Sequence, residues 1–401
     1  MTRGAAIALV VLLPAIAYAG FTETAPASTF VLDASYVMSW VRGAWGADGG
    51  REPLVDEVKL YEPGGPLQGI LVPDPLVRQQ VLVTQVQYGV TDWLSVGLGV
   101  PVVLRAQVDP RFGWIPGEYQ TRLGRVYSQD DFWQWAAGMG QVEPGTFDGN
   151  HGVLSDLVLG VRWRWSDHVP GLREAGWGLS LMLTGMLPTG RAADPDQVIA
   201  VGTTLWDLMA QGDLGAHLGV DKGFADLDDR LSLGLDLYYE AFFRRTRRAP
   251  RGGTENLLLL NQAPYVGETY TVKPGDWAGA AFQVTTVPWK GPALGTWLTG
   301  GDQARAARLP PLLSVTLGYR FVGMQQTDYA SHSPHWDWNH EKERQPGWRH
   351  YLAARVTFSF LRLGAPLQVY VLGSATSWIP GKNCMAPDAL TMGVQIPFKL
   401  W

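Results

Sequence analysis

The sequence of 401 residues predicts an all-β fold, a closed antiparallel transmembrane β-barrel of about 12 strands with long extracellular loops and mostly short periplasmic turns. Three observations predict it. Apolar and polar residues alternate along many segments, the chain begins with an export signal yet has one cysteine, and the last strand ends on an aromatic residue.

The segment 92–105 shows the alternation most clearly. Every second residue from Leu94 to Leu104 is apolar, whereas small or polar residues, among them Ser95 and Arg105, lie on the other face of an extended strand. A long strand with one apolar face needs an apolar medium along its length. That medium is either the core of a soluble β-protein or the lipid around a barrel with a wet lumen.

The N-terminus has the features of a secretory signal. Arg3 precedes an apolar run, and an A-x-A cleavage site ends at Ala19, so residues 1–19 are expected to be a signal peptide. Residues 20–29 would then be a short periplasmic segment and residues 30–401 the barrel. This organisation predicts a location in the outer membrane of a Gram-negative bacterium.

Composition narrows the class further. No later stretch approaches 18 apolar residues, so no helix is expected to span a membrane. Cys384 is the only cysteine, which excludes a scaffold of internal disulfides. The formal net charge of −5 argues against nucleic acid as a partner, and 18 Trp residues are typical of a membrane edge.

Twelve strands are expected in order along the chain, and the segment 206–221 alternates too strictly to be a helix. The expected strands are 30–42, 77–88, 92–105, 153–165, 177–188, 206–221, 229–240, 277–288, 312–323, 350–362, 367–378 and 389–400. Long loops follow the first, third, seventh and ninth strands, including the Gly- and Pro-rich residues 43–75. The connection 289–311 is too long for a tight turn and does not fit the scheme.

Three features favour lipid over a soluble core. They are the signal without paired cysteines, the even strand count with alternating loop lengths, and the C-terminal strand, in which every second residue from Leu390 to Leu400 is apolar. Trp401 lies one position off that register. An open strand edge would leave backbone groups unpaired in lipid, so the barrel must close.

Three short motifs carry a resemblance to a known family. Tyr88–Pro101 (YGVTDWLSVGLGVP), Ser155–Gly160 (SDLVLG) and Leu187–Gly190 (LPTG) are similar to motifs of bacterial outer-membrane barrels that act as transporters of the meta-pathway of phenol degradation. The resemblance covers roughly residues 80–240 and the last strand. It implies passive uptake of small, aromatic or hydrophobic solutes and insertion by the barrel-assembly machinery, with no catalytic signature and no cofactor.

The polar faces of the strands are expected to line the lumen with both signs of charge. The candidate lumen residues are Asp33, Arg105, Asp156, Arg162, Arg164, Asp207, Asp213, His217, Asp236, Glu240, Arg320 and Arg355. Two interpretations stay open: the charges line a solute path, or they pair across a narrow barrel and fill it.

Two loops carry further candidate partners. Arg244, Arg245, Arg247 and Arg248 would suit the phosphates of lipopolysaccharide if their loop faces outward, although a solvated basic loop is the simpler interpretation. His332, His335, His340 and Glu341 could offer metal ligands. They lie in a flexible loop and on no rigid element, so no metal site is expected.

Two other classes of function remain as alternatives. A hydrolase needs at least a Ser-His pair, and His217 and Ser232 could be cross-strand neighbours, although no motif surrounds them. A structural or adhesive surface barrel would use the long loops as its working part. We expect no enzyme activity.

Overall fold

The computed structural model describes residues 21–399 with internal gaps. The described part omits 55–56, 62–64, 121–122, 139–144, 150–151, 173, 191–211, 225–226, 249–268, 293, 295–308 and 332–345.

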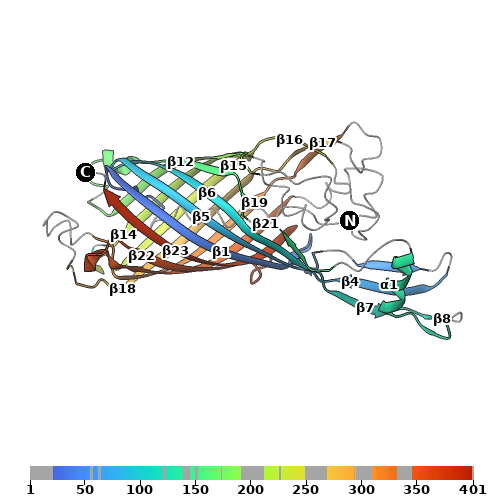
Figure 1. The fold of residues 1–401 in the computed structure, drawn as a ribbon. Coiled ribbons are helices and arrows are strands. Elements are labelled where there is room, and N and C mark those ends of the chain that lie inside the picture. Colours follow the sequence, from blue (N-terminus) through green and yellow to red (C-terminus); the bar gives the residue numbers. More distant parts are fainter. Residues whose placement is uncertain are drawn as a thin grey trace.

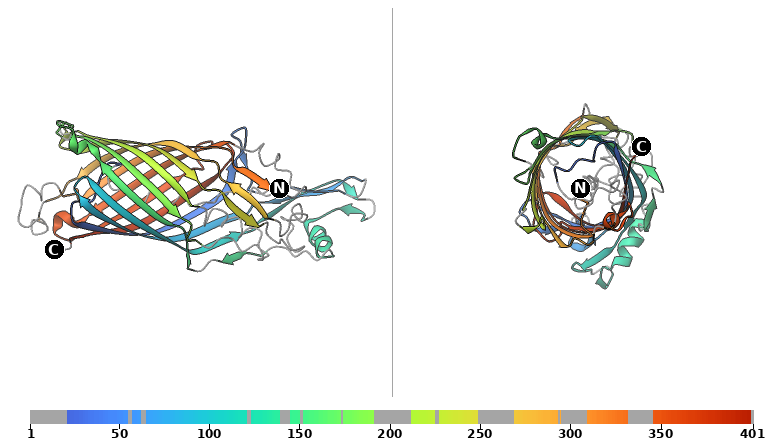
Figure 2. Two further views of the ribbon diagram at one scale, coloured as in Figure 1. Left: turned by 90° about the horizontal axis from the view of Figure 1, so that it is seen from above. Right: turned by 90° about the vertical axis from the view of Figure 1, so that its left-hand side faces the viewer.

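Twelve long strands form a closed antiparallel barrel, as the alternation predicts (Figure 1). They are β1 (Thr29–Trp45), β5 (Leu76–Thr91), β6 (Leu94–Asp109), β12 (Leu157–Arg164), β13 (Trp177–Leu187), β14 (Asp213–Gly223), β15 (Leu231–Phe242), β18 (Trp277–Trp289), β19 (Leu313–Met324), β21 (Gly347–Ser359), β22 (Gln368–Ala375) and β23 (Cys384–Lys399). Each pairs with the next, and β23 pairs with β1 from Thr29↔Lys399 to Trp45↔Cys384. Figure 2 shows the resulting ring end on.

The apolar faces of the strands lie outside this ring. On β6, Leu98 is 40% exposed and Ser95 only 1%. Leu183, Leu214 and Leu317 on other strands are likewise exposed. Apolar residues outside and polar residues inside are the arrangement of a barrel in lipid and the reverse of a soluble one. Of the two media that the alternation allowed, a soluble core or lipid, the structure therefore favours lipid.

The two ends of the barrel differ. We call the end at Asp92–Trp93 and Phe360–Leu363 the short-turn rim, and the opposite end the long-loop rim. Beyond the long-loop rim, a folded extension projects from the barrel (Figure 1). The long loops expected after the first and third strands, residues 43–75 and 106–152, therefore contain regular structure that the sequence did not indicate.

The extension contains a three-stranded sheet and the single α-helix of the described chain. Its elements are β3 (Val58–Tyr61), β4 (Leu67–Pro73), β7 (Phe112–Pro116), β8 (Tyr119–Gln120), β9 (Arg125–Val126) and α1 (Gln129–Gly138), with β2 (Arg51–Glu52), β10 (Phe147–Gly149) and β11 (Val153–Leu154) added to the barrel sheet. A second small sheet on the same rim joins β16 (Arg245–Arg248), β17 (Thr269–Lys273) and β20 (Asp328–Ser331).

A capping box begins helix α1. Asp131 accepts the Ser128 N–H at 2.8 Å, and the Ser128 hydroxyl accepts the Asp131 N–H at 3.3 Å. Arg125 adds a two-pronged ion pair to the Asp131 carboxylate. The hydrogen bonds from Arg125 and Ser128 hold the pKa of the Asp131 carboxyl well below its usual range.

The inner face of β1, β5 and β6 is apolar near the long-loop rim. Leu54, from the loop after β2, packs there against a buried cluster that contains Val37, Val41, Ala44, Val77, Val81, Val83, Val103, Ala106, Val108 and Ala389. The lumen is therefore not polar throughout, because part of its wall is packed like a protein core.

The prediction that Arg105 faces the lumen is corrected by this cluster. The ladder between β5 and β6 shifts between Gln80↔Arg105 and Val81↔Val103, so one residue is inserted there. A bulge reverses the alternation beyond it. Ala106 consequently joins the interior cluster, and Arg105 lies on the opposite face.

No helix among the described residues is long and apolar enough to cross a membrane.

Candidate functional site

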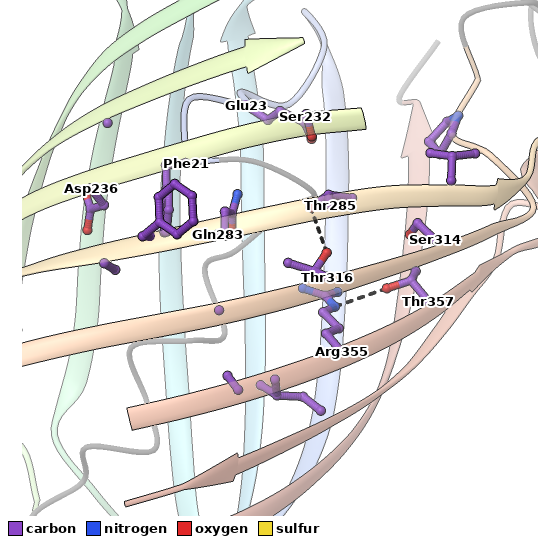
Figure 3. Close-up of a pocket in the computed structure, with 18 of the residues that line it drawn as sticks. Phe21, Glu23, Ser232, Asp236, Gln283, Thr285, Ser314, Thr316, Arg355 and Thr357 are labelled. Carbon is purple, nitrogen blue, oxygen red and sulfur yellow. Dashed lines mark hydrogen bonds between the residues drawn. The ribbon is translucent and has the colours of Figure 1, made fainter. Parts of the chain in front are cut away.

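A cavity of about 620 Å³ lies inside the barrel (Figure 3). Residues of β12 to β15, β18, β19 and β21 to β23 line it, together with the chain that precedes β1. A space of this size is in the range of pockets that hold small organic molecules.

One wall of the cavity is rich in hydroxyl groups. Thr285 and Thr316 share a hydrogen bond of 2.9 Å between β18 and β19, and Arg355 Nε donates to the Thr357 hydroxyl at 3.2 Å (Figure 3). Ser314 lies beside them. Alternation on antiparallel strands brings these side chains to the same inner face.

The opposite boundary is the N-terminal segment, which we define as residues 21–28. Phe21 and Glu23 line the cavity (Figure 3). The Thr22 N–H donates to the Asp221 carboxylate at 2.6 Å, and Arg162 donates to the Glu23 carbonyl at 2.8 Å. We expected this segment in the periplasm, but its described part lies against the inner wall and narrows the lumen.

Glycines on the wall make room for the segment. A Cβ at Gly219 on β14 would lie 2.8 Å from the Phe21 carbonyl oxygen, and one at Gly178 on β13 would overlap the Thr22 hydroxyl. The Ser180 hydroxyl also donates to the Phe21 carbonyl at 3.1 Å. Inward-facing glycines in strands often mark a close approach of another backbone, and they are the sequence signal that could have revealed this contact.

A second set of bonds fixes the segment at the short-turn rim. The Thr24 hydroxyl donates to the Asp92 carbonyl at 2.6 Å, and the Ala27 N–H to the Asp92 carboxylate at 3.0 Å. The Ser28 N–H donates to the Gly89 carbonyl at 2.8 Å. The turn between β5 and β6 therefore anchors the chain just before β1.

The structure brings five of the predicted lumen residues to the cavity: Arg162, His217, Asp236, Arg320 and Arg355. Asp33, Asp156, Asp213 and Glu240 are buried in the wall and do not line the cavity. Asp207 lies outside the described residues.

Two of the buried acids, Asp33 and Asp156, have a local partner rather than one across the lumen. Asp33 accepts the Tyr370 hydroxyl at 3.1 Å and the Gln395 amide at 2.6 Å. Asp156 accepts the Gly190 N–H at 2.7 Å. These contacts join neighbouring parts of the wall.

Arg164 lies at the short-turn rim and not at the cavity. It forms a pair with Asp167 at 2.7 Å and also donates to the Asp92 carbonyl at 2.9 Å. This guanidinium group therefore joins the turn after β12 to the turn between β5 and β6.

The basic loop and the histidine loop lie at the long-loop rim or outside the described chain. Arg244 pairs with Asp328 at 2.6 Å, while Arg245, Arg247 and Arg248 belong to strand β16. His332, His335, His340 and Glu341 lie outside the described residues. Within the described ranges, no group of three or more His, Cys, Asp or Glu side chains could hold a metal ion.

His217 and Ser232 are not neighbours. Ser232 pairs with Gly223, six residues further along β14 than His217, which corresponds to about 20 Å at about 3.3 Å per residue. His217 Nδ1 is instead 3.0 Å from the Asp236 carboxylate. The Ser-His pair that a hydrolase requires is therefore not assembled by these two residues.

Comparison with solved structures identifies the architecture. An outer membrane channel from Pseudomonas putida F1 is similar over 94% of this chain and 98% of that chain, with a TM-score of 0.55 and 11% sequence identity. The fold is that of an outer-membrane β-barrel. This likeness agrees with the resemblance to outer-membrane transporters that the sequence motifs suggested.

Other solved outer-membrane proteins are more distant in structure. The CymD monoaromatic hydrocarbon channel has a TM-score of 0.34 and 10% identity over 94% of this chain and 90% of that chain. A Pseudomonas aeruginosa FadL homologue has a TM-score of 0.30 and 10% identity over 92% of this chain and 90% of that chain. The sequence matches no known family model, and no curated protein matches it.

Proposed function

We propose that the chain is an outer-membrane channel for the passive uptake of small apolar or amphiphilic solutes. The observation that carries the proposal is the cavity enclosed by the barrel, about 620 Å³ in volume and lined by hydroxyl groups and by charged side chains of both signs. A wall of this kind offers no single strong field for an ion. It suits solutes that combine an apolar body with a few polar atoms.

The apolar inner face of β1, β5 and β6 supports the same solute class. Val37, Val81 and Val103 lie in its buried cluster, whereas a lumen built for ions would carry charged side chains there.

The orientation and the membrane partners belong to the proposal. The termini and the short-turn rim would face the periplasm after removal of residues 1–19, and the long-loop rim would face outward. Arg245, Arg247 and Arg248 on β16 would then lie where lipopolysaccharide phosphates are found. The exposed apolar belt would contact lipid, and the barrel-assembly machinery would insert it.

Uptake by proteoliposomes tests the proposal. Purified full-length protein should admit benzyl alcohol and other small monoaromatic solutes faster than protein-free liposomes, with little flux of sugars or salts while the N-terminal segment is in place. Liposomes that contain an equal amount of heat-unfolded protein are the control. If folded protein admits none of the solutes tested, the transport proposal is wrong.

A structural or adhesive surface role is a second candidate, because the extension is a folded unit. Strands β3, β4 and β7 pair in register, and Phe132 of α1 is fully buried beneath ring contacts with Trp114 and Trp135. Removing the extension should abolish attachment and leave solute flux intact if this role is correct. Loss of flux with attachment retained would favour the channel.

A further inference from the structure

A row of hydrogen-bond donors crosses four neighbouring strands of the cavity wall. Ser232, Thr285, Thr316 and Arg355 lie directly opposite one another on β15, β18, β19 and β21, and we call them the donor row. All four side chains line the cavity (Figure 3). Because neighbouring strands lie about 4.8 Å apart, these side chains form one continuous strip on the inner wall.

Arg355 ends the donor row and is held in place by its neighbours. Its guanidinium carbon lies 4.0 Å from the centroid of the Tyr370 ring, and its Nε donates to the Thr357 hydroxyl at 3.2 Å. The Tyr370 hydroxyl in turn donates to the Asp33 carboxylate at 3.1 Å. A guanidinium group can only donate hydrogen bonds and matches the planar shape of a carboxylate. Held in this way, it loses little freedom when a ligand binds.

The hydroxyl groups of the row supply further donors. Thr285 and Thr316 share one hydrogen bond of 2.9 Å. Each hydroxyl carries one proton, so one of the two donates to the other, and the second proton remains for a ligand oxygen. Ser232 adds another hydroxyl at the far end of the row. The row therefore combines a positive charge with neutral donors.

Small residues beside the donor row leave room for an apolar body. Ala281, Gly318 and Ala353 line the cavity on the side of the row further from the short-turn rim. Arg320, the next long side chain on β19, follows Thr316 by four positions, which corresponds to about 13 Å at about 3.3 Å per residue. The small residues between them form a floor on which a single ring fits.

The N-terminal segment brings a carboxylate of its own to this part of the cavity. Glu23 lines the cavity and its side chain is exposed to the lumen (Figure 3). The guanidinium groups of Arg162, Arg164 and Arg355 attract the Glu23 carboxylate, whereas the Asp221 carboxylate repels it. These three positive groups and one negative group make the position of the Glu23 carboxylate favourable for an anion.

Glu23 is the acid that a solute can replace. Two acids interact with Arg355, Glu23 and Asp33. Asp33 is only 4% exposed and does not line the cavity, because Tyr370 and Gln395 cover and bind its carboxylate. The segment that carries Glu23 is held through its main chain, including the bond from Arg162 to the Glu23 carbonyl. The Glu23 side chain can therefore leave Arg355 without breaking that bond.

We propose that the donor row binds the carboxylate of a small anionic amphiphile, and that Glu23 competes with this carboxylate for Arg355. The apolar body of the solute lies over Ala281, Gly318 and Ala353. A solute carboxylate that replaces Glu23 beside Arg355 keeps the two charges balanced. The proposal rests on the channel function above and names the solute group that the channel recognises.

Binding of three matched probes to the full-length protein in nanodiscs tests the proposal, with ligand-observed NMR as the readout. The probes are benzoate, benzamide and benzamidinium, which share a ring and a planar head group and differ in charge. Benzoate should bind at least about fivefold more tightly than benzamide, because its oxygens accept charge-assisted hydrogen bonds. Benzamidinium should bind most weakly, since its head group carries donors only.

Two variants test the competitor and the row separately. Glu23→Gln removes the competing charge and should tighten benzoate about three- to tenfold while benzamide changes by less than about twofold. A gain of affinity cannot result from failure to fold. Thr316→Val removes one hydroxyl of the row and should weaken benzoate about three- to tenfold, the usual effect of one hydrogen bond.

The control variant is Glu174→Gln, in the exposed turn between β12 and β13. It changes the net charge as Glu23→Gln does and should bind all three probes as the unmodified protein does. Heat-modifiable migration should show that every variant folds. Tighter binding of benzamide or benzamidinium than of benzoate would overturn the proposal, and so would an unchanged benzoate affinity in Glu23→Gln or in Thr316→Val.

Solute flux, measured separately, distinguishes failure of this site from failure of the channel. If liposomes take up benzyl alcohol but benzoate binds no more tightly than benzamide, the carboxylate site is wrong and the channel stands. If no solute crosses, the channel is wrong even where benzoate binds.

Discussion

Displacing the N-terminal segment should open the barrel, and Asp221 is the side chain to change. Its carboxylate accepts the Thr22 N–H at 2.6 Å from within the wall. A hydrogen bond to a charged group contributes about 1.5–3 kcal/mol, so Asp221→Ala should raise the population of the displaced segment roughly 10- to 150-fold. In planar bilayers the variant should enter a larger conductance level more often than the unmodified protein does. The size of that level should be the same in both proteins.

A mature chain that lacks residues 21–27 should hold this larger level permanently. Asp328→Ala is the matched control, because it removes an acid from an ion pair with Arg244 at the opposite rim and touches no part of the segment. Equal conductance of the shortened and complete chains would refute the reasoning, since the segment would then not restrict the path.

Three further changes test the wall and the extension. Gly279→Val should lower the free energy of unfolding by about 1–3 kcal/mol, measured in urea, because it overlaps the Tyr238 ring. Leu98→Arg should cost about 2–4 kcal/mol and reduce folded protein in membrane fractions. In the extension, Arg125 holds the pKa of Asp131 below its unfolded value of about 3.9. Its stabilising effect is complete above that pH and declines as pH falls, so hydrogen exchange of the α1 amides should accelerate below about pH 4.

Each of these has a result that would contradict it. Gly373→Ala is the control for the first, since a Cβ there meets nothing within 4 Å, and equal losses in both variants would argue against a specific overlap. Ser95→Arg, on the inner face, should be tolerated better than Leu98→Arg, and equal damage would reverse the assignment of the faces. If hydrogen exchange of the α1 amides does not respond to pH, or responds equally in Asp131→Asn, the ion pair does not stabilise the helix.

The strands could be predicted because every strand of a barrel in lipid alternates apolar residues outside with polar residues inside. All 12 expected segments overlap a barrel strand, and β23 closes on β1 as the argument from unpaired edges requires. The rule fails where the ladder is irregular. Arg105 was assigned to the lumen because alternation was continued through a bulge, and the sequence around Leu104 gives no sign of the inserted residue.

The contacts inside the barrel were less predictable, because inward-facing side chains bond to residues on strands that are distant in sequence. Arg162 was one of the charges that could pair across the lumen, yet it donates to the Glu23 carbonyl of a segment with no periodic pattern. Asp236 binds His217 on the adjacent strand. Such contacts depend on strand register and tilt, which composition and alternation leave open.

Glycines on the inner wall create space inside the barrel because they have no side chain. Gly178 and Gly219 on β13 and β14 admit the N-terminal segment, and Gly279 on β18, two strands beyond β14, admits the Tyr238 ring. Because each glycine faces a different neighbour, filling one should change one property at a time. Gly219→Val should displace the segment and raise conductance, whereas Gly279→Val should destabilise the wall. The lumen is therefore shaped at separate positions, and its conductance and the stability of its wall can be varied independently.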